Sequence, residues 1–253
     1  MFNYDNFEFR YDPFPFAHKQ GIVSADMYKE MVQNFPPLDF YNKKVDKRGI
    51  LKFYLNEGKT KDRYEAFLES KPIWKETHKY IKSKKFLDDV FGLLQRNKIN
   101  MGYNAPQLSI ARRLRQALGD VVKRGRLPEF PKGYYARFEF SILPADGGAL
   151  LPHTDQHQKL ITLVIYLPEE GEWDQSWGGG LELSRPKDMT ENFNWMNKKY
   201  LFEAVDEIVT FPYVPNSSTL FVKTFNSHHC VRPMTGKGTR ALRKTLTINI
   251  ETN

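Results

Sequence analysis

Several classes of protein are excluded by what the chain lacks. Cys230 is the one cysteine among 253 residues, so neither an internal disulfide nor a multi-cysteine zinc site can form. No apolar run approaches the roughly 18 residues that a membrane helix needs, and the first residues show no basic leader followed by an apolar stretch. We therefore expect a cytoplasmic protein that makes no membrane contact.

The residues that are present indicate a globular protein. Apolar residues make up 40% of the chain, aromatic residues 14% and charged residues 27%, a balance that excludes disorder and coiled coil. At about 150 residues per domain, the length favours one domain, 1–253. Its periodicity predicts two parts, a mostly helical support over 1–132 and a β-rich core over 133–253.

Charge is unevenly distributed along the sequence. The net charge is +8, yet residues 41–132 hold 23 Lys/Arg against 10 Asp/Glu, so the remainder is mildly acidic. A basic segment can bind an anionic partner such as nucleic acid. Solvated helix faces are the favoured interpretation, because the segment lacks interleaved aromatic residues. The tightest basic cluster is Arg112, Arg113, Arg115, Lys123, Arg124 and Arg126.

Helical spacing dominates the first part of the chain. Ser24 is a candidate N-cap for a helix over 25–35, which Pro36-Pro37 ends. Similar apolar patterns predict helices over 60–70, 72–82 and 84–96, and a further basic helix over 105–124.

From Gly133 onward the apolar period shifts toward two. The pattern predicts strands over 134–143, 159–167, 179–184, 200–211, 218–224, 228–232 and 243–251. Strands without intervening helices indicate an antiparallel sandwich or barrel. The connections over 167–179 and 185–199 are long, and function commonly resides in such loops.

One pair of residues in this β-rich part is typical of a metal site. His153 and Asp155 are separated by one residue, so on an extended backbone their side chains would share a face. A third ligand from another strand would complete a 2-His-1-carboxylate face, which suits non-haem Fe(II). His229 is the candidate, although an HxD pair alone is a weak signal.

The order of the surrounding motifs strengthens the signal. HxD is followed by a strand (LITLVIYLP), a Gly-rich turn (GGGLEL), the segment SHHCVRP and a basic strand (RKTLTINIE). Over residues 133–253 the chain resembles the Fe(II)- and 2-oxoglutarate-dependent oxygenases of the prolyl 4-hydroxylase-like group. The resemblance implies a double-stranded β-helix, a jelly roll of about eight strands, supported on its outer face by the N-terminal helices.

The resemblance also implies roles for individual residues. His153, Asp155 and His229 match the iron ligands, and Ser227, Val231 and Pro233 complete the family's pattern around His229. Arg243 matches the cation that holds the distal carboxylate of 2-oxoglutarate, and Thr247 matches a hydroxyl that assists it. Arg240 competes with Arg243 for this role. Leu143 stands where some prolyl hydroxylases have a tyrosine, so the keto-acid pocket must be completed differently.

The implied function is hydroxylation of an unactivated C–H bond in a small molecule or a peptidyl side chain. Fe(II), 2-oxoglutarate and O2 are the implied cofactors, with ascorbate as a further candidate, and 2-oxoglutarate would be decarboxylated to succinate. Two alternatives remain open, namely oxidative demethylation of a nucleic-acid base and a non-catalytic jelly-roll binding protein.

Other residues near these motifs carry weaker expectations. Arg137, Glu139 and Ser141 share one face of the strand before HxD and are expected to face the substrate. His157, His228 and Cys230 are expected to lie outside the metal site. The acidic, Trp-rich segment 169–177 is a candidate lid.

Overall fold

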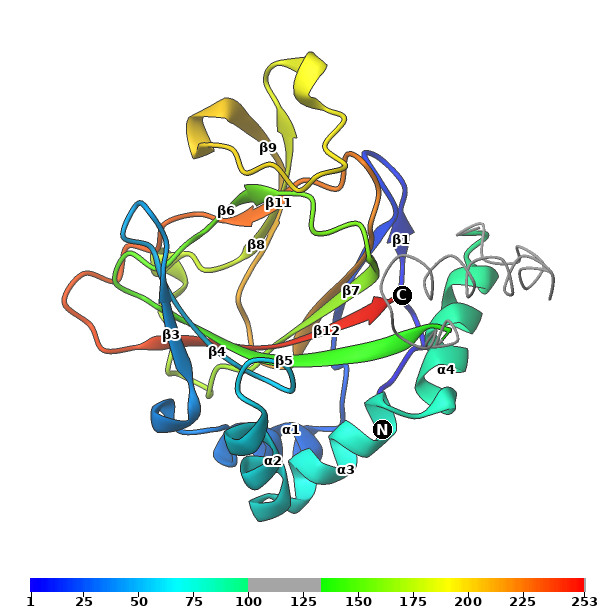
Figure 1. The fold of residues 1–253 in the computed structure, drawn as a ribbon, viewed down its shortest axis with the longest axis vertical. Helices are drawn as coiled ribbons and strands as arrows, with labels where there is room; N and C mark the ends of the chain where they lie inside the picture. Colours follow the sequence, from blue (N-terminus) through cyan, green and yellow to red (C-terminus); the bar gives the residue numbers. More distant parts are fainter. Residues whose placement is uncertain (100–132, 253) are drawn as a thin grey trace, which may run out of the picture.

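The protein is described by a computed structural model that covers residues 1–99 and 133–252. Two antiparallel sheets face one another (Figure 1). The larger has the order β1-β2-β10-β7-β12-β5-β4-β3 and the smaller the order β6-β11-β8-β9. The predicted double-stranded β-helix is confirmed, and eight of the strands, β5 to β12, follow residue 133.

The strands have these bounds: β1 Phe9–Arg10, β2 Phe16–Gln20, β3 Asn42–Val45, β4 Leu51–Asn56, β5 Tyr135–Pro144, β6 Leu150–His153, β7 Lys159–Tyr166, β8 Leu181–Pro186, β9 Val205–Phe211, β10 Ser217–Val222, β11 His229–Val231 and β12 Leu242–Glu251. The helices are α1 Ala25–Gln33, α2 Lys61–Ser70, α3 Pro72–Ile81 and α4 Lys84–Arg96. Short 3-10 turns cover Leu38–Phe40, Gln175–Trp177, Met189–Glu191 and Phe202–Ala204.

The N-terminal part is less helical than its sequence predicts. Four strands lie within residues 1–56, where β2 pairs with β10 at one side of the large sheet and β4 pairs with β5 at the other. β1 and β3 are short or rich in lysine, so their own apolar pattern is weak. β4 alternates apolar residues at Leu51, Phe53 and Leu55, a strand signal that the sequence analysis passed over. The expected helix over 105–124 lies outside the described residues.

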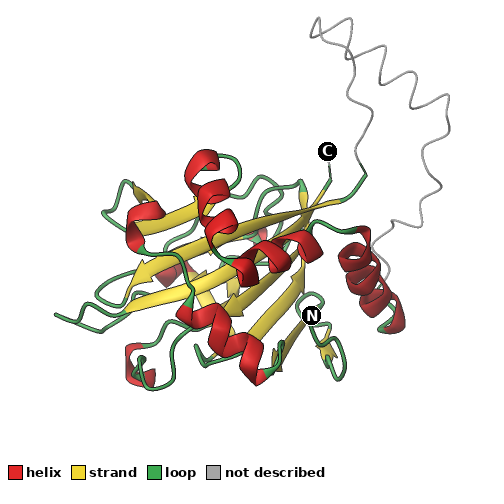
Figure 2. Ribbon diagram, turned by 90° about the horizontal axis from the view of Figure 1, so that it is seen from below, coloured by secondary structure: helices red, strands yellow, loops and turns green. Residues whose placement is uncertain are grey.

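The four other predicted helices are confirmed to within two residues at either end. Ser24 caps α1 as expected, since its Oγ accepts a hydrogen bond from the backbone N–H of Met27. The helices lie against the outer face of the large sheet (Figure 2). Their apolar faces share one core with the aromatic side chains that β5 turns outward, such as Phe138 and Phe140.

Alternation along β5 and β12 divides the large sheet into two chemically different faces. The strands pair over ten residues, with Arg243 opposite Leu143 and Thr247 opposite Glu139. Because successive side chains point to opposite faces, the apolar set meets the helices and the polar set points between the two sheets. The candidate site lies in that interlayer space. Within the described residues, no helix is long and apolar enough to cross a membrane.

Candidate metal centre

The two candidate histidine ligands are direct neighbours across the small sheet. His153 ends β6 and is paired in register with His229, the first residue of β11. Their ring centroids lie 4.4 Å apart. The potential ligand atoms of His153, Asp155 and His229 all lie within 4.8 Å of one another, and all three residues are buried. The fold therefore brings together the three residues that the sequence nominated.

Asp155 reaches this cluster by a route different from the one that its spacing suggests. It lies beyond the end of β6 and has a φ of +72°, in the left-handed region that aspartate tolerates better than most residues. The expected extended alternation from His153 to Asp155 is therefore wrong. A turn swings the carboxylate back toward both imidazoles, with Oδ1 3.5 Å from His153 Nε2 and Oδ2 3.8 Å from His229 Nε2.

Hydrogen bonds to the backbone fix which imidazole nitrogen is available for a metal. His153 Nδ1 lies 2.8 Å from the carbonyl oxygen of Leu151, and His229 Nδ1 lies 2.9 Å from that of Ser227. A carbonyl oxygen only accepts, so each Nδ1 carries the proton and donates. Each Nε2 then presents its lone pair toward Asp155, which is the arrangement of a metal-binding histidine.

The protonation states of Asp155 and His229 suit a divalent cation. Burial would raise the pKa of Asp155, but Lys159 and the two imidazoles oppose it and hold that pKa well below its usual value. Burial, with His153 alongside, lowers the pKa of His229 to about 3. A carboxylate and neutral imidazoles are the forms that bind metal.

A hydroxyl outside the cluster ties the two ligand segments together. Ser227 Oγ lies 3.3 Å from the carbonyl oxygen of Thr154 and 3.0 Å from that of Thr224. It also accepts a hydrogen bond from the backbone N–H of Thr224. Ser227 therefore joins the turn before His229 to the peptide between His153 and Asp155, which gives the serine of the SHHCVRP segment a structural role.

Arg243 is a buried cation in the same interlayer space. Its guanidinium lies 5.4 Å from the ring centre of Tyr166 and 5.2 Å from that of Tyr213, and Nε donates to the carbonyl oxygen of Gly179. Burial lowers the pKa of Arg243 and the two tyrosines raise it, with a net shift downward. An arginine remains charged despite such a shift. Its terminal nitrogens form no hydrogen bond within the described part of the chain.

The glycine turn before β8 packs closely against Trp173 and presents its carbonyl oxygen to this arginine. Gly179 has a φ of +88°, and a Cβ there would lie 2.9 Å from Trp173 Cζ2 and 3.4 Å from Arg243 Cδ. A side chain would therefore strain the backbone and clash with Trp173, while it would only touch Arg243.

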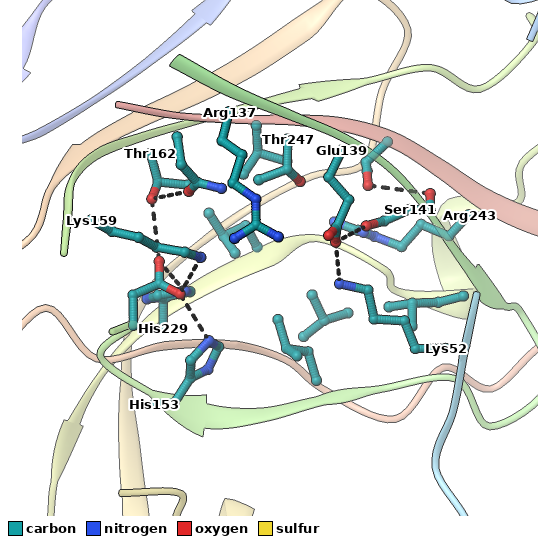
Figure 3. Close-up of a pocket in the computed structure, with 18 residues that line it drawn as sticks. Lys52, Arg137, Glu139, Ser141, His153, Lys159, Thr162, His229, Arg243 and Thr247 are labelled. Atoms are coloured by element: carbon teal, nitrogen blue, oxygen red, sulfur yellow. Dashed lines mark hydrogen bonds and ion pairs between the residues drawn. The ribbon is translucent and has the colours of Figure 1, made fainter. Parts of the chain in front are cut away.

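The metal ligands and Arg243 line one cavity of about 150 Å³ (Figure 3). Leu143, Thr245 and Thr247 line it as well, whereas Arg240 is exposed and is absent from the lining. Thr245 lies between Arg243 and Thr247 on the same strand face and is 2% exposed. The sequence analysis passed over Thr245, although its spacing of two residues from Arg243 on a strand signals a shared face.

The cavity contains further polar residues that the sequence did not single out. Lys159 Nζ lies 2.8 Å from Asp155 Oδ1, and Lys52 Nζ lies 2.9 Å from Glu139 Oε1. Thr162 Oγ1 lies 3.2 Å from Asp155 Oδ2. Arg137, Glu139 and Ser141 all line the cavity, in agreement with their expected shared face. Lys52 gave no sequence signal, because β4 was not predicted.

The residues expected outside the cluster lie outside it. His157 is exposed, and its ring centroid lies 6.3 Å from that of Trp195. His228 is buried on the other side of β11, with Nε2 3.3 Å from the carbonyl oxygen of Asn192. Cys230 is buried, and burial raises the pKa of its thiol. The basic cluster from Arg112 to Arg126 lies outside the described residues.

The two long connections contact opposite ends of the site. Segment 169–177 packs at the Arg243 end, where Trp173 is 8% exposed and lies against Tyr213. This candidate lid is thus anchored by a buried side chain. The 185–199 connection lies beside HxD, because Thr154 Oγ1 donates to the carbonyl oxygen of Asn194.

One family model matches the part of the chain that carries this site. Residues 138–251 match the family model of the 2OG-Fe(II) oxygenase superfamily. A prolyl hydroxylase from Trichoplax adhaerens, solved with a hypoxia inducible factor peptide, is 15% identical over 93% of this chain and 83% of its own, with a TM-score of 0.46. A prolyl-4-hydroxylase from Pseudomonas putida is 15% identical over 94% and 92%, with a TM-score of 0.48.

Both TM-scores lie below 0.5, so neither similarity says what this chain does. Comparison with the curated proteins gave no match. The matched region holds the three clustered residues and Arg243, in the order that the motifs predicted. Residues 138–251 thus match the 2OG-Fe(II) oxygenase superfamily, whose members use Fe(II), 2-oxoglutarate and O2, in agreement with the resemblance that the motifs indicated.

Proposed function

We propose that the protein is a 2-oxoglutarate-dependent dioxygenase that hydroxylates an unactivated C–H bond. His153, Asp155 and His229 would hold Fe(II), and Arg243 would hold the distal carboxylate of 2-oxoglutarate. The observation that carries the proposal is a buried His-Asp-His cluster with both Nε2 lone pairs turned inward, in one cavity with a buried guanidinium. Either feature alone would be compatible with a structural role.

A ferrous ion at these three residues, with 2-oxoglutarate and O2, supplies oxidation of a C–H bond coupled to decarboxylation of 2-oxoglutarate to succinate. Arg243 supports it as a fixed guanidinium whose free terminal nitrogens can pair with a carboxylate in two places. Thr245 and Thr247 offer hydroxyls on the same face. Leu143, opposite Arg243, would keep this part of the cavity apolar and help to exclude water.

The decisive experiment uses the purified chain under nitrogen with Fe(II) and 2-oxoglutarate. We expect a weak visible charge-transfer band for the wild type and none for His153→Ala, because loss of one imidazole removes a ligand. His157→Ala serves as the control, since His157 is exposed and lies outside the cluster. We expect His157→Ala to retain the band.

Turnover is then measured as succinate release across amino acids, peptides, sugars and nucleotides. Release that depends on one substrate class, together with a product heavier by one oxygen atom, supports hydroxylation. If the wild type binds no 2-oxoglutarate under nitrogen, the enzyme proposal is abandoned in favour of a non-catalytic jelly-roll protein. Retention on DNA or RNA that falls steeply with salt would point to a nucleic-acid substrate instead.

A further inference from the structure

Cations outnumber carboxylates in the candidate cavity. Among the described residues that line it, four side chains are cationic and two are anionic. The cations are Lys52, Arg137, Lys159 and Arg243, and the anions are Glu139 and Asp155. Under the proposed function, Fe(II) and 2-oxoglutarate carry equal and opposite charges. Their binding therefore leaves the positive excess of the cavity unchanged.

Glu139 is already fully engaged and cannot balance this excess. Its carboxylate accepts hydrogen bonds from Lys52 Nζ at 2.9 Å, from Asn56 Nδ2 at 2.9 Å and from Ser141 Oγ at 3.0 Å. Burial would raise its pKa, but Lys52 and these hydrogen bonds lower it to about 2. Glu139 and Lys52 therefore form a closed pair on one side of the cavity.

Lys159 is likewise committed, to the carboxylate of Asp155. Arg137 is different. Its guanidinium points into the cavity between the metal cluster and Glu139 (Figure 3). In the described part of the chain its one charged partner is Glu251, with 3.7 Å between NH1 and Oε1, which is too long for a hydrogen bond. Tyr135 also donates to Glu251 at 3.1 Å.

The position of Arg137 fits a substrate contact. Its side chain is 34% exposed, whereas Arg243 is buried. Arg137 therefore lies where the cavity meets solvent, and Arg243 lies at its closed end. Asn249, opposite Arg137 on β12, accepts a hydrogen bond from Thr162, which in turn lies beside Asp155. Arg137 thus extends from the same patch of sheet that abuts the metal ligands.

We propose that Arg137 binds a carboxylate of the primary substrate and so positions the neighbouring carbon atoms over the metal cluster. The proposal rests on the proposed function of the same site and adds the substrate class, a carboxylic acid. An arginine with free donors at the mouth of a positively charged cavity attracts such a group and binds it in two places. The acid can be a free amino or organic acid or the side chain of an acidic peptide.

The test measures binding in a complex that cannot turn over. The full chain is saturated with Mn(II) and 2-oxoglutarate, and the rise in melting temperature is recorded with matched pairs of ligands. The pairs are amino acids and dicarboxylic acids with their amides, and short peptides containing Asp or Glu with the Asn or Gln versions. The variants are Arg137→Gln and Arg137→Lys, with Arg185→Gln as control, because Arg185 is a cation outside the cavity.

We expect acids to stabilise the wild type and the Arg185→Gln control, and amides to stabilise neither. Arg137→Gln should weaken acid binding by about 30-fold or more, because it removes a charged hydrogen bond. Arg137→Lys should weaken it by less, because lysine keeps the charge and loses only the two-point pairing of a guanidinium with a carboxylate. Stabilisation by free acids identifies a small-molecule substrate, and stabilisation by acidic peptides alone identifies a peptidyl one.

Any of three results in the acid titrations would overturn the proposal. They are equal stabilisation by acids and by their amides, no stabilisation by any tested acid at millimolar concentration, and an acid affinity in Arg137→Gln equal to that of the wild type. A loss of 2-oxoglutarate affinity in Arg137→Gln would also overturn it, by assigning this arginine to the co-substrate. Failure of the proposed function gives a different result, since the wild type would then bind no 2-oxoglutarate before any acid is added.

Discussion

The two faces of the strand pair β5 and β12 differ sharply in the polarity of their side chains. On the outer face, Phe138, Phe140 and Ile248 are buried against the helices. On the inner face of the same strands, Arg137, Glu139 and Arg243 line the cavity. Neighbouring residues therefore serve different purposes. The outer face supplies apolar burial that stabilises the fold, and the inner face carries polar groups whose positions matter for binding.

The largest effect is expected when a large side chain on the outer face is replaced by a small one. Phe140 is 0% exposed, and its ring lies 4.7 Å from Trp74 and 5.4 Å from Phe67. Phe140→Ala should lower the free energy of unfolding by about 3–5 kcal/mol, because it opens a cavity among aromatic rings. Denaturant unfolding measures this. Its matched control is Ser141→Ala, the next residue on the opposite face, with an expected loss of about 1 kcal/mol.

A substitution at the closed end of the cavity should reverse this pattern. Arg243→Gln removes the buried charge that faces the cavity. We expect the affinity for 2-oxoglutarate to fall about 100-fold, since hydrogen bonds to a charged group are lost, while unfolding changes less than in Phe140→Ala. Titration of the anaerobic Fe(II) complex measures the affinity. Arg240→Gln is the control, and an equal effect there would make Arg240 the anchor.

The glycine turn should give a smaller effect that links both properties. Gly179→Ala places a methyl group on a backbone with a φ of +88° and against Trp173 and Arg243. We expect a loss of about 1–2 kcal/mol in unfolding free energy. A shift of the Gly179 carbonyl oxygen, which accepts from Arg243 Nε, should also reduce 2-oxoglutarate affinity by about tenfold. Gly171→Ala is a useful comparison, because Gly171 has a φ of +76° with open space around it. Only the unfolding effect should appear in that variant.

The effect expected from Glu139 differs from the others because it depends on pH. The pKa of Glu139 is lowered to about 2 in the folded chain, from an ordinary value of 4.5. Its ionised form therefore stabilises the fold above about pH 4.5, and that stabilisation is lost as the pH falls toward 2. Glu139→Gln should melt at a lower temperature than the wild type at pH 7, and the difference should shrink toward pH 3. A difference that is constant with pH would exclude the charge as its cause.

The sequence predicted the elements whose pattern is set by the core. Helices α1 to α4 and most strands after residue 133 lie where apolar spacing placed them. Most of the missed strands lack that signal, although β4 (LKFYLN) carries it at Leu51, Phe53 and Leu55. β3 reads NKKV and β6 reads LLPH, and each takes its conformation from a partner strand. Pairing over long sequence separations cannot be read from a local pattern.

The site was predictable in its members but not in its construction. HxD, His229 and Arg243 were nominated from motif order, and the structure gathers them in one cavity. The left-handed turn at Asp155, the Ser227 hydrogen bond to Thr154 and the pairing of Lys159 depend on contacts that form only in the folded chain. Their residue types allow many other partners, so the sequence alone does not specify them.

The location of the clustered ligands on one sheet and of Arg243 on the other has a mechanical consequence. His153 and His229 belong to the four-stranded sheet, whereas Arg243 belongs to the eight-stranded sheet. The distance between the two sheets therefore decides whether one molecule can contact both the clustered ligands and Arg243. Under the proposed function that molecule is the keto-acid, so a core substitution that shifts one layer should weaken its binding even when every residue of the cavity is intact. The affinity for the keto-acid would then report how well the two layers keep their spacing.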